Sequence, residues 1–202
     1  MIIFVVLSVA WQEVNINIQQ LNGCPLTVMN VLDAISTRRS IRRYKLEPIP
    51  NGDLEKILAA AQIAPSAGNK QPWRFVVVSD TETKKKLGEM ARNQTWISDA
   101  GIIIVALAMD KDSPEIYEKW VEKDVMIAVE HIVLAAWSLG YGTCWIGAFY
   151  EDRVKTLLGV PEKMKAVCLL PVGVPDHSPE ARPRRPLSEL FHKNKFGTPL
   201  KL

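Results

Sequence analysis

The residues best suited to chemistry in this chain are arginines that crowd into one short segment. Positions 38–44 read Arg-Arg-Ser-Ile-Arg-Arg-Tyr, so four guanidinium groups and a serine hydroxyl fall within seven residues. A guanidinium presents a planar fork of donors that matches two phosphate oxygens at once, and a nearby hydroxyl adds a donor without adding charge. The segment therefore predicts a phosphate clamp, although a solvated basic face or a nucleic-acid patch would leave the same pattern.

A second basic cluster lies near the C-terminus, in a proline-rich stretch that holds Arg182, Arg184 and Arg185. Taken alone, this cluster is typical of an ordinary solvated loop. Because the first cluster exists, the sequence also permits the two to converge on a single phosphate.

Composition and charge limit the classes of protein that this chain can belong to. The chain has 202 residues, 48% apolar and 23% charged, which predicts one globular domain with a sizeable core. The net charge of +3 favours anionic ligands over an anionic polymer, and Tyr44 is the one aromatic near the first cluster that could stack on a base. No nucleic-acid partner is therefore expected.

Cysteine and histidine spacing predicts neither a disulfide framework nor a metal site. Cys24, Cys144 and Cys168 are odd in number and form no CxxC pair, which fits reduced thiols in a cytoplasmic protein. The three histidines are far apart and belong to no ligand motif. The apolar segment 1–10 is too short to span a bilayer, so no membrane partner is expected.

Two interpretations of residues 1–27 remain open, and the single domain is expected to cover residues 28–202. The first 27 residues could form an arm that pairs with a neighbouring subunit, or they could be a leader upstream of a natural start at Met29. Within the domain, Val28, Val31, Leu32 and Ile35 have the spacing of a short amphipathic helix packed on something larger, which would fix the arginine segment at its N-terminal side.

Further elements follow in order along the chain. A helix is predicted from Asn51, as N-cap, to about Ala64, followed by a loop over 65–73 that is rich in serine, glycine and asparagine. Such a loop offers free backbone donors, although a plain surface turn would look the same. The remaining expected elements are a strand at 75–78, a helix at 81–92, a strand at 101–109 buried on both faces, a helix at 113–139, a glycine-rich strand within 140–149, a helix at 152–158 and a strand at 166–172.

The longest predicted helix, 113–139, is apolar on most sides in its second half. It should therefore lie at the centre of the molecule or across a subunit boundary. The glycines of 140–149 are compatible with a close approach of the backbone to a ligand. They do not match a dinucleotide-binding fingerprint, because Trp145 stands where the third glycine would be.

Four blocks together resemble the nitroreductase family of FMN-dependent oxidoreductases, over nearly all of residues 29–196. The blocks are 38–42, 65–73, 140–149 and 182–184, and they occur in the family's order. The resemblance implies an α+β fold, with a mostly antiparallel sheet flanked by helices, in an intertwined homodimer. It also implies two FMN sites, each built from both subunits.

Matched position by position, the resemblance assigns a role to each block. The residues expected to hold the FMN phosphate are Arg38, Ser40, Arg182 and Arg184. Arg39 and Arg42 would reach the ribityl chain and the pyrimidine edge of the flavin, where a cation stabilises the reduced form. The partner subunit would cover the other side of the flavin with Pro65, Ser66, Ala67 and Asn69.

The segment expected to lie against the flavin ring is Trp145, Ile146, Gly147 and Ala148. The backbone N–H of Gly147 would point at N5, the atom that accepts and releases hydride. Some members of the family have an acidic side chain at this position, so the pocket here would lack a carboxylate. The short connection 110–113 leaves little room for a long lid, which indicates an open pocket.

The function implied is a two-step exchange in which NAD(P)H reduces bound FMN and leaves before a small electron-poor acceptor, such as a nitroaromatic or a quinone, is reduced. Alternatives on the same fold are reductive dehalogenation and oxygen-dependent flavin breakdown. A flavin-storing protein without catalytic turnover is an alternative of a different class.

Overall fold

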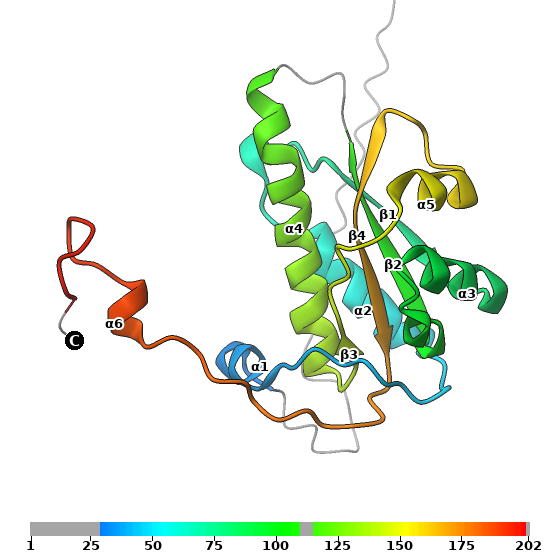
Figure 1. The fold of residues 1–202 in the computed structure, drawn as a ribbon, viewed down its shortest axis with the longest axis horizontal. Coiled ribbons are helices and arrows are strands. Elements are labelled where there is room, and N and C mark those ends of the chain that lie inside the picture. Colours follow the sequence, from blue (N-terminus) through cyan, green and yellow to red (C-terminus); the bar gives the residue numbers. More distant parts are fainter. Residues whose placement is uncertain (1–28, 110–114, 201–202) are drawn as a thin grey trace, which may run out of the picture.

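The computed structural model of the chain describes residues 29–109 and 115–200. The expected arm or leader at 1–27 and the connection 110–113 lie outside these residues. The fold is α+β, with a four-stranded antiparallel sheet in the order β1-β2-β4-β3 (Figure 1). Its strands are β1 (Trp73–Val78), β2 (Ile102–Met109), β3 (Gly142–Thr143) and β4 (Met164–Gly173).

Strand β2 forms the middle of the core, as its uninterrupted apolar sequence predicted. Ile104 faces one side of the sheet, which is covered by α2 (Asn51–Gln62) and α4 (Glu115–Ser138). Ile103 and Val105 face the other side, towards α3 (Thr81–Met90) and α5 (Glu151–Leu158). Because each fully buried aliphatic side chain contributes about 1.5–3 kcal/mol, this two-sided burial fixes the strand and its neighbours firmly.

Helix α4, with 24 residues, crosses the first of these faces from end to end (Figure 1). The predicted long helix is confirmed, and its second half is buried as expected, with Val125, Val129 and Ile132 fully inaccessible. Just after the helix, the Tyr141 hydroxyl donates to Asp53 Oδ2 at 2.9 Å and so ties this end to α2. Burial and the Asp53 carboxylate raise the pKa of Tyr141 to about 12, which keeps the donor protonated.

The short helix α1 (Val31–Thr37) forms as predicted, but its apolar stripe does not pack on the described part of its own chain. Val31, Leu32 and Ile35 are each more than half exposed, and Ala34 is the buried residue of the helix. An apolar stripe predicts burial without saying which chain provides the cover. The helix is attached instead by a hydrogen bond from Trp137 Nε1 to Thr37 Oγ1, at 2.9 Å.

The glycine-rich strand expected within 140–149 is also largely wrong. Only Gly142–Thr143 pairs as β3, and Ile146 makes an isolated bridge to Leu169. The close approach at Gly142 is to the chain itself, because a Cβ there would lie 2.4 Å from Ile41 Cγ1. This glycine therefore lets the arginine segment lie directly against the edge of the sheet.

Several element ends and small helices differ from the expectation. Pro50, not Asn51, occupies the N-cap of α2, and Asp80 caps α3 by accepting from the Thr83 N–H. Three small helices were not predicted: η1 (Ala67–Asn69), η2 (Thr95–Asp99) and α6 (Leu187–Leu190). Helix α6 stands away from the sheet on an extended C-terminal segment (Figure 1).

Across the helices that the structure describes, none has both the length and the apolar composition that crossing a membrane requires.

The Gly142 contact leads to a stability prediction. Gly142→Ala should lower the free energy of unfolding by about 1–3 kcal/mol, because the new methyl group overlaps the Ile41 side chain. Gly52→Ala is the matched control, since a Cβ there meets nothing within 4 Å and alanine favours a helix by up to about 1 kcal/mol. Thermal and urea unfolding would measure both.

Adding Ile41→Ala to the Gly142→Ala variant should recover part of the loss that the overlap causes, as a double-mutant cycle would show. Equal stability of Gly142→Ala and Gly52→Ala would contradict the overlap.

Candidate functional site

The arginine segment 38–44 is held against the sheet at its C-terminal side as well as by α1. The Ile41 N–H donates to the Thr143 carbonyl at 2.9 Å, and Ser40 forms a parallel bridge to the same residue. Tyr44 is buried and its hydroxyl donates to the Ile41 carbonyl at 2.9 Å. The buried residues Ile41 and Tyr44 thus flank the exposed Arg42 and Arg43.

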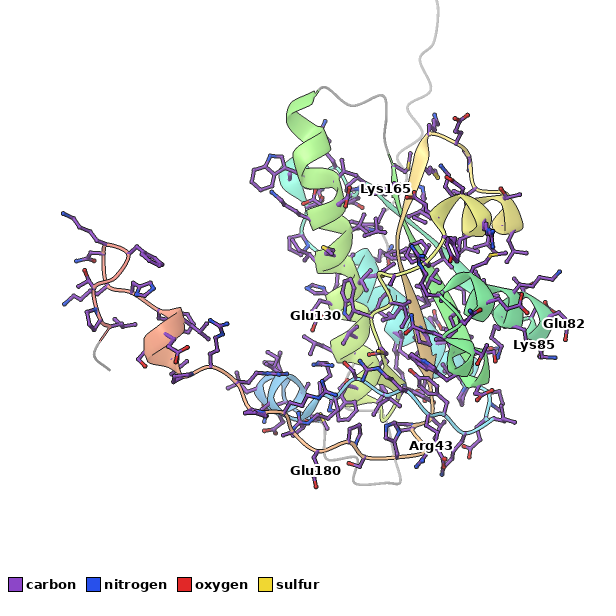
Figure 2. The ribbon with its side chains drawn as sticks, in the orientation of Figure 1. Arg43, Glu82, Lys85, Glu130, Lys165 and Glu180 are labelled. Carbon is purple, nitrogen blue, oxygen red and sulfur yellow. The ribbon has the colours of Figure 1, made fainter. Side chains whose placement is uncertain are left out.

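A pair of charged residues brings the C-terminal segment beside this one. Arg43 Nε lies 3.0 Å from Asp176 Oδ2, and its Nη2 donates to the Asp176 carbonyl at 2.8 Å. The Asp176 N–H donates in return to the Arg43 carbonyl at 3.0 Å. An exposed ion pair alone stabilises little, but the added main-chain bonds set where the segment after β4 begins (Figure 2).

The two basic clusters converge on one cavity of about 240 Å³, as the sequence permitted. It is lined by Arg38, Arg39, Ser40, Arg42, Pro179, Glu180, Arg182 and Arg184. Five guanidinium groups face one carboxylate there, so the cavity carries an excess of positive charge that favours an anion. Arg185 is not among the lining residues.

One of the lining residues, Arg39, also contacts the end of α1. Arg39 Nη1 donates to the carbonyls of Ser36 and Arg38, both at 2.9 Å, so part of its guanidinium caps the end of α1.

Burial raises the pKa of the Cys144 thiol, while the guanidinium of Arg42 and a hydrogen bond with Ser40 oppose the shift. The thiol therefore stays protonated behind the cavity.

The loop that contains Pro65, Ser66, Ala67 and Asn69 is attached to the first half of α4. The Ala67 N–H donates to Asp124 Oδ2 at 3.0 Å, and Ser66 Oγ accepts from the Gln71 N–H at 2.9 Å. Asn69 and Gln71 both have left-handed backbones, with φ of 54° and 49°. Each such residue is strained by about 1–2 kcal/mol, so the loop is a built conformation and the plain surface turn is the poorer description.

The segment 145–148 lies between these two regions. The indole Nε1 of Trp145 donates to Glu130 Oε2 at 3.3 Å, beside the middle of α4 (Figure 2). Ile146 is buried, and its N–H and carbonyl both pair with Leu169 at 3.0 Å. Gly147 and Ala148 are exposed, and a Cβ on Gly147 would meet nothing within 4 Å, so this stretch of main chain faces open space.

Helix α4 therefore carries all three segments, each through one polar side chain. Asp124 holds the loop at 65–69, Glu130 holds Trp145, and Trp137 holds the end of α1 next to the arginines. From Asp124 to Trp137 the helix rises by about 20 Å, at 1.5 Å per residue. A single chain thus brings the arginines together but keeps the 65–69 loop away from them.

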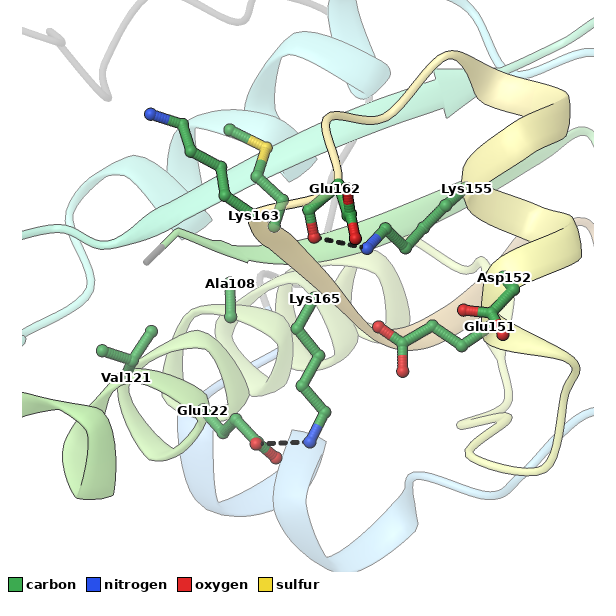
Figure 3. A pocket seen from close by; sticks show the side chains of 10 residues that line it. Ala108, Val121, Glu122, Glu151, Asp152, Lys155, Glu162, Lys163 and Lys165 are labelled. Carbon is green, nitrogen blue, oxygen red and sulfur yellow. Dashed lines mark hydrogen bonds and ion pairs between the residues drawn. The ribbon is translucent and has the colours of Figure 1, made fainter. Parts of the chain in front are cut away.

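A second cavity, of about 550 Å³, lies between the first part of α4, the start of β4 and α5 (Figure 3). Its lysines already have partners: Lys165 Nζ lies 2.6 Å from Glu122 Oε1, and Lys155 Nζ donates to the Glu162 carbonyl at 2.7 Å. With four carboxylates against three ammonium groups in its lining, this cavity has no excess of positive charge to favour an anion. The arginine cavity is the better candidate site.

Asp124 and Glu130 were not singled out from the sequence, although a signal existed for Asp124. It is an acidic residue in the buried part of α4, only 6% exposed, and a carboxylate is rarely buried without a specific partner.

Within the part of the chain that the structure describes, no group of three or more histidine, cysteine or acidic side chains could hold a metal ion.

Comparison with known proteins points to one family. The chain matches the nitroreductase family over residues 35–101 and 89–174. A relative from Archaeoglobus fulgidus, provisionally named NADH dehydrogenase/NAD(P)H nitroreductase, is 44% identical over 148 residues, which are 71% of this chain and 84% of the relative.

Solved structures agree with this match. A nitroreductase family protein from Clostridium novyi is 34% identical, with a TM-score of 0.70 over 85% of this chain and 97% of that one. The NADPH:FMN oxidoreductase from Vibrio harveyi, solved in complex with NAD+, is 28% identical, with a TM-score of 0.77 over 82% of this chain and 77% of that one. The chain belongs to the nitroreductase family.

Proposed function

We propose that this protein is an FMN-dependent oxidoreductase that takes hydride from NAD(P)H and passes the electrons to small electron-poor acceptors. The observation that carries the proposal is the convergence of both basic clusters on one cavity. The Vibrio harveyi relative, named for NADPH and FMN, supports the choice of cofactor and donor.

The residues of the cavity fit a phosphate monoester. Arg38, Arg182 and Arg184 supply charge-assisted donors, and Ser40 supplies a neutral one. Arg42, an exposed arginine that lines the cavity, would extend towards the sugar chain and the pyrimidine edge of FMN. Arg39 contributes there with the part of its guanidinium that α1 does not use.

Two copies of the chain complete the site. The arginines and the 65–69 loop lie about 20 Å apart along α4, so antiparallel pairing of two α4 helices would set the loop of one copy opposite the arginines of the other. Large apolar side chains are exposed where such a partner would lie, namely Val31, Leu32, Ile35, Met126 and Ile127. Pro65, Ser66, Ala67 and Asn69 then cover the flavin of the partner subunit.

The extended C-terminal segment fits an intertwined homodimer. Leu187 and Leu190 on α6, and Phe191 directly after it, are each at least half exposed, and α6 stands away from its own sheet (Figure 1). Exposed apolar side chains of this size are expected to be covered by another surface. We therefore propose that this segment packs against the partner subunit.

The main chain at 145–148 supplies the reactive contact. FMN held here would supply N5, the atom that accepts and releases hydride. The Gly147 N–H would donate to N5, and Trp145 and Ala148 would flank the ring. Ile146 holds this main chain through its pairing with Leu169. No side-chain acid or base is required, since the protein positions the cofactor and stabilises charge.

The acceptor is expected to be a small nitroaromatic or a quinone, because exposed Gly147 and Ala148 leave open space above the segment. A cytoplasmic location suits the supply of NAD(P)H and the free, buried thiols of Cys144 and Cys168. A flavin-storing protein is the second candidate, and the first experiment below separates the two.

The visible spectrum of the purified protein tests the proposal directly. We expect a flavin spectrum that bleaches when NADH or NADPH is added without oxygen and returns when a quinone follows. A flavin spectrum that persists with both donors would indicate storage, and failure to bind added FMN would refute the proposed function.

Binding of FMN to variants tests the phosphate clamp. Arg182→Ala should weaken FMN binding at least about tenfold, since a charge-assisted hydrogen bond is worth about 1.5–3 kcal/mol. Arg185→Ala is the matched control, because Arg185 lies in the same segment but does not line the cavity. Quenching of FMN fluorescence measures both affinities. If the two variants lost the same affinity, the arginines would act through their overall positive charge and not through contacts in the cavity.

The role of the Gly147 main chain is tested by removing its N–H. Gly147→Pro should slow anaerobic flavin reduction by about 10- to 100-fold, because a donor at the site of developing charge is lost. Gly147→Ala keeps the N–H and has space for its methyl group, so its rate should stay near that of the unchanged protein. Similar stopped-flow rates for the two variants would argue against the assignment.

A further inference from the structure

Asp124 has a feature that its helix does not explain. The residue is only 6% exposed on α4, an arrangement that is unfavourable for a charge unless a specific partner compensates. The partner is the main-chain N–H of Ala67, at 3.0 Å, the first residue of η1. A buried charge is therefore used to fix the start of one exposed loop.

The loop that it fixes is strained and internally bonded. Gly68, Asn69 and Gln71 all have left-handed backbones, and Ser66 Oγ and the Gln71 side chain form hydrogen bonds inside the loop. Conformations of this kind persist where the surroundings over-determine them, as they do at ligand clamps. Pro65 and Asn69 are nevertheless exposed, so their shape serves no packing within their own chain.

We infer that Asp124 is a positioning residue that holds the 65–69 loop in the shape required by the flavin of the partner subunit. The inference rests on the proposed function, because it requires FMN sites shared between two chains. Asp124 itself touches no cofactor. Its effect passes through the Ala67 N–H, and it acts in the site whose arginines belong to the other copy.

Variants at position 124 separate positioning from folding. Asp124→Ala should weaken FMN binding about tenfold, because the loop loses its fixed start. Asp124→Asn keeps an oxygen acceptor and should restore most of the affinity. Asp124→Leu fills the space without a charge, so it should melt no lower than the unchanged protein while still binding FMN weakly. Glu122→Ala, at an exposed carboxylate on the same helix, is the matched control and should bind FMN normally.

A heterodimer shows in which site Asp124 acts. Chains with Asp124→Ala and Arg38→Ala, carrying different affinity tags, would be coexpressed and isolated by both tags in turn. If Asp124 acts across the dimer, one of the two sites combines an intact loop with intact arginines, and the heterodimer binds one FMN per dimer with normal affinity. Titration with FMN counts these sites.

The outcomes distinguish the inference from the proposed function. Normal FMN binding by Asp124→Ala would overturn the inference alone, and so would a heterodimer with two weakened sites, because Asp124 would then act within its own chain. Failure of the unchanged protein to bind FMN would overturn the proposed function, and the inference with it.

Discussion

The mutual repulsion of the arginines is the constraint on which the rest of the site depends. Five guanidinium groups line one small cavity beside one carboxylate, so they would separate unless the main chain beneath them were fixed. Burial of Ile41 and Tyr44 fixes the first segment, and the absence of a side chain at Gly142 allows this burial. The contacts between Arg43 and Asp176 fix the start of the second. The charge is thus concentrated by apolar packing, and an anion that enters would relieve the repulsion.

Helix α4 sets the distances between the parts of the site. Its buried face packs on the sheet, while Asp124, Glu130 and Trp137 each hold one segment at a defined height. A rigid helix cannot bring its two ends together, so within one chain the 65–69 loop stays away from the arginines. If two chains share each site, folding, pairing and cofactor binding stabilise one another, since a ligand that binds only the dimer shifts the equilibrium towards it.

The sequence predicted those features that local pattern determines. The apolar run of β2 and the long apolar half of α4 leave few alternatives, and both elements formed where expected. The 140–149 segment was misjudged because one of its glycines, Gly142, is required by the contact with Ile41, which is distant in sequence and adjacent in space. The stripe of α1 predicted burial but is exposed on the described chain, because an apolar pattern does not record which surface covers it. Asp124 escaped notice because its partner is a main-chain N–H, and the identity of a residue does not record main-chain contacts.

The position of the Gly147 main chain affects which electron acceptors the protein could reduce. A side chain that donated to the flavin would also shape the space above it, and would admit some acceptors and exclude others. The proposed donor is the main-chain N–H of Gly147, next to Ile146, which is held by its pairing with Leu169. With this donor, no side chain would need to project into the open side. Selectivity would then depend on the reduction potential of the acceptor more than on its shape. An enzyme built in this way is expected to accept many small oxidants, and such breadth follows from the same glycine that leaves the main chain accessible.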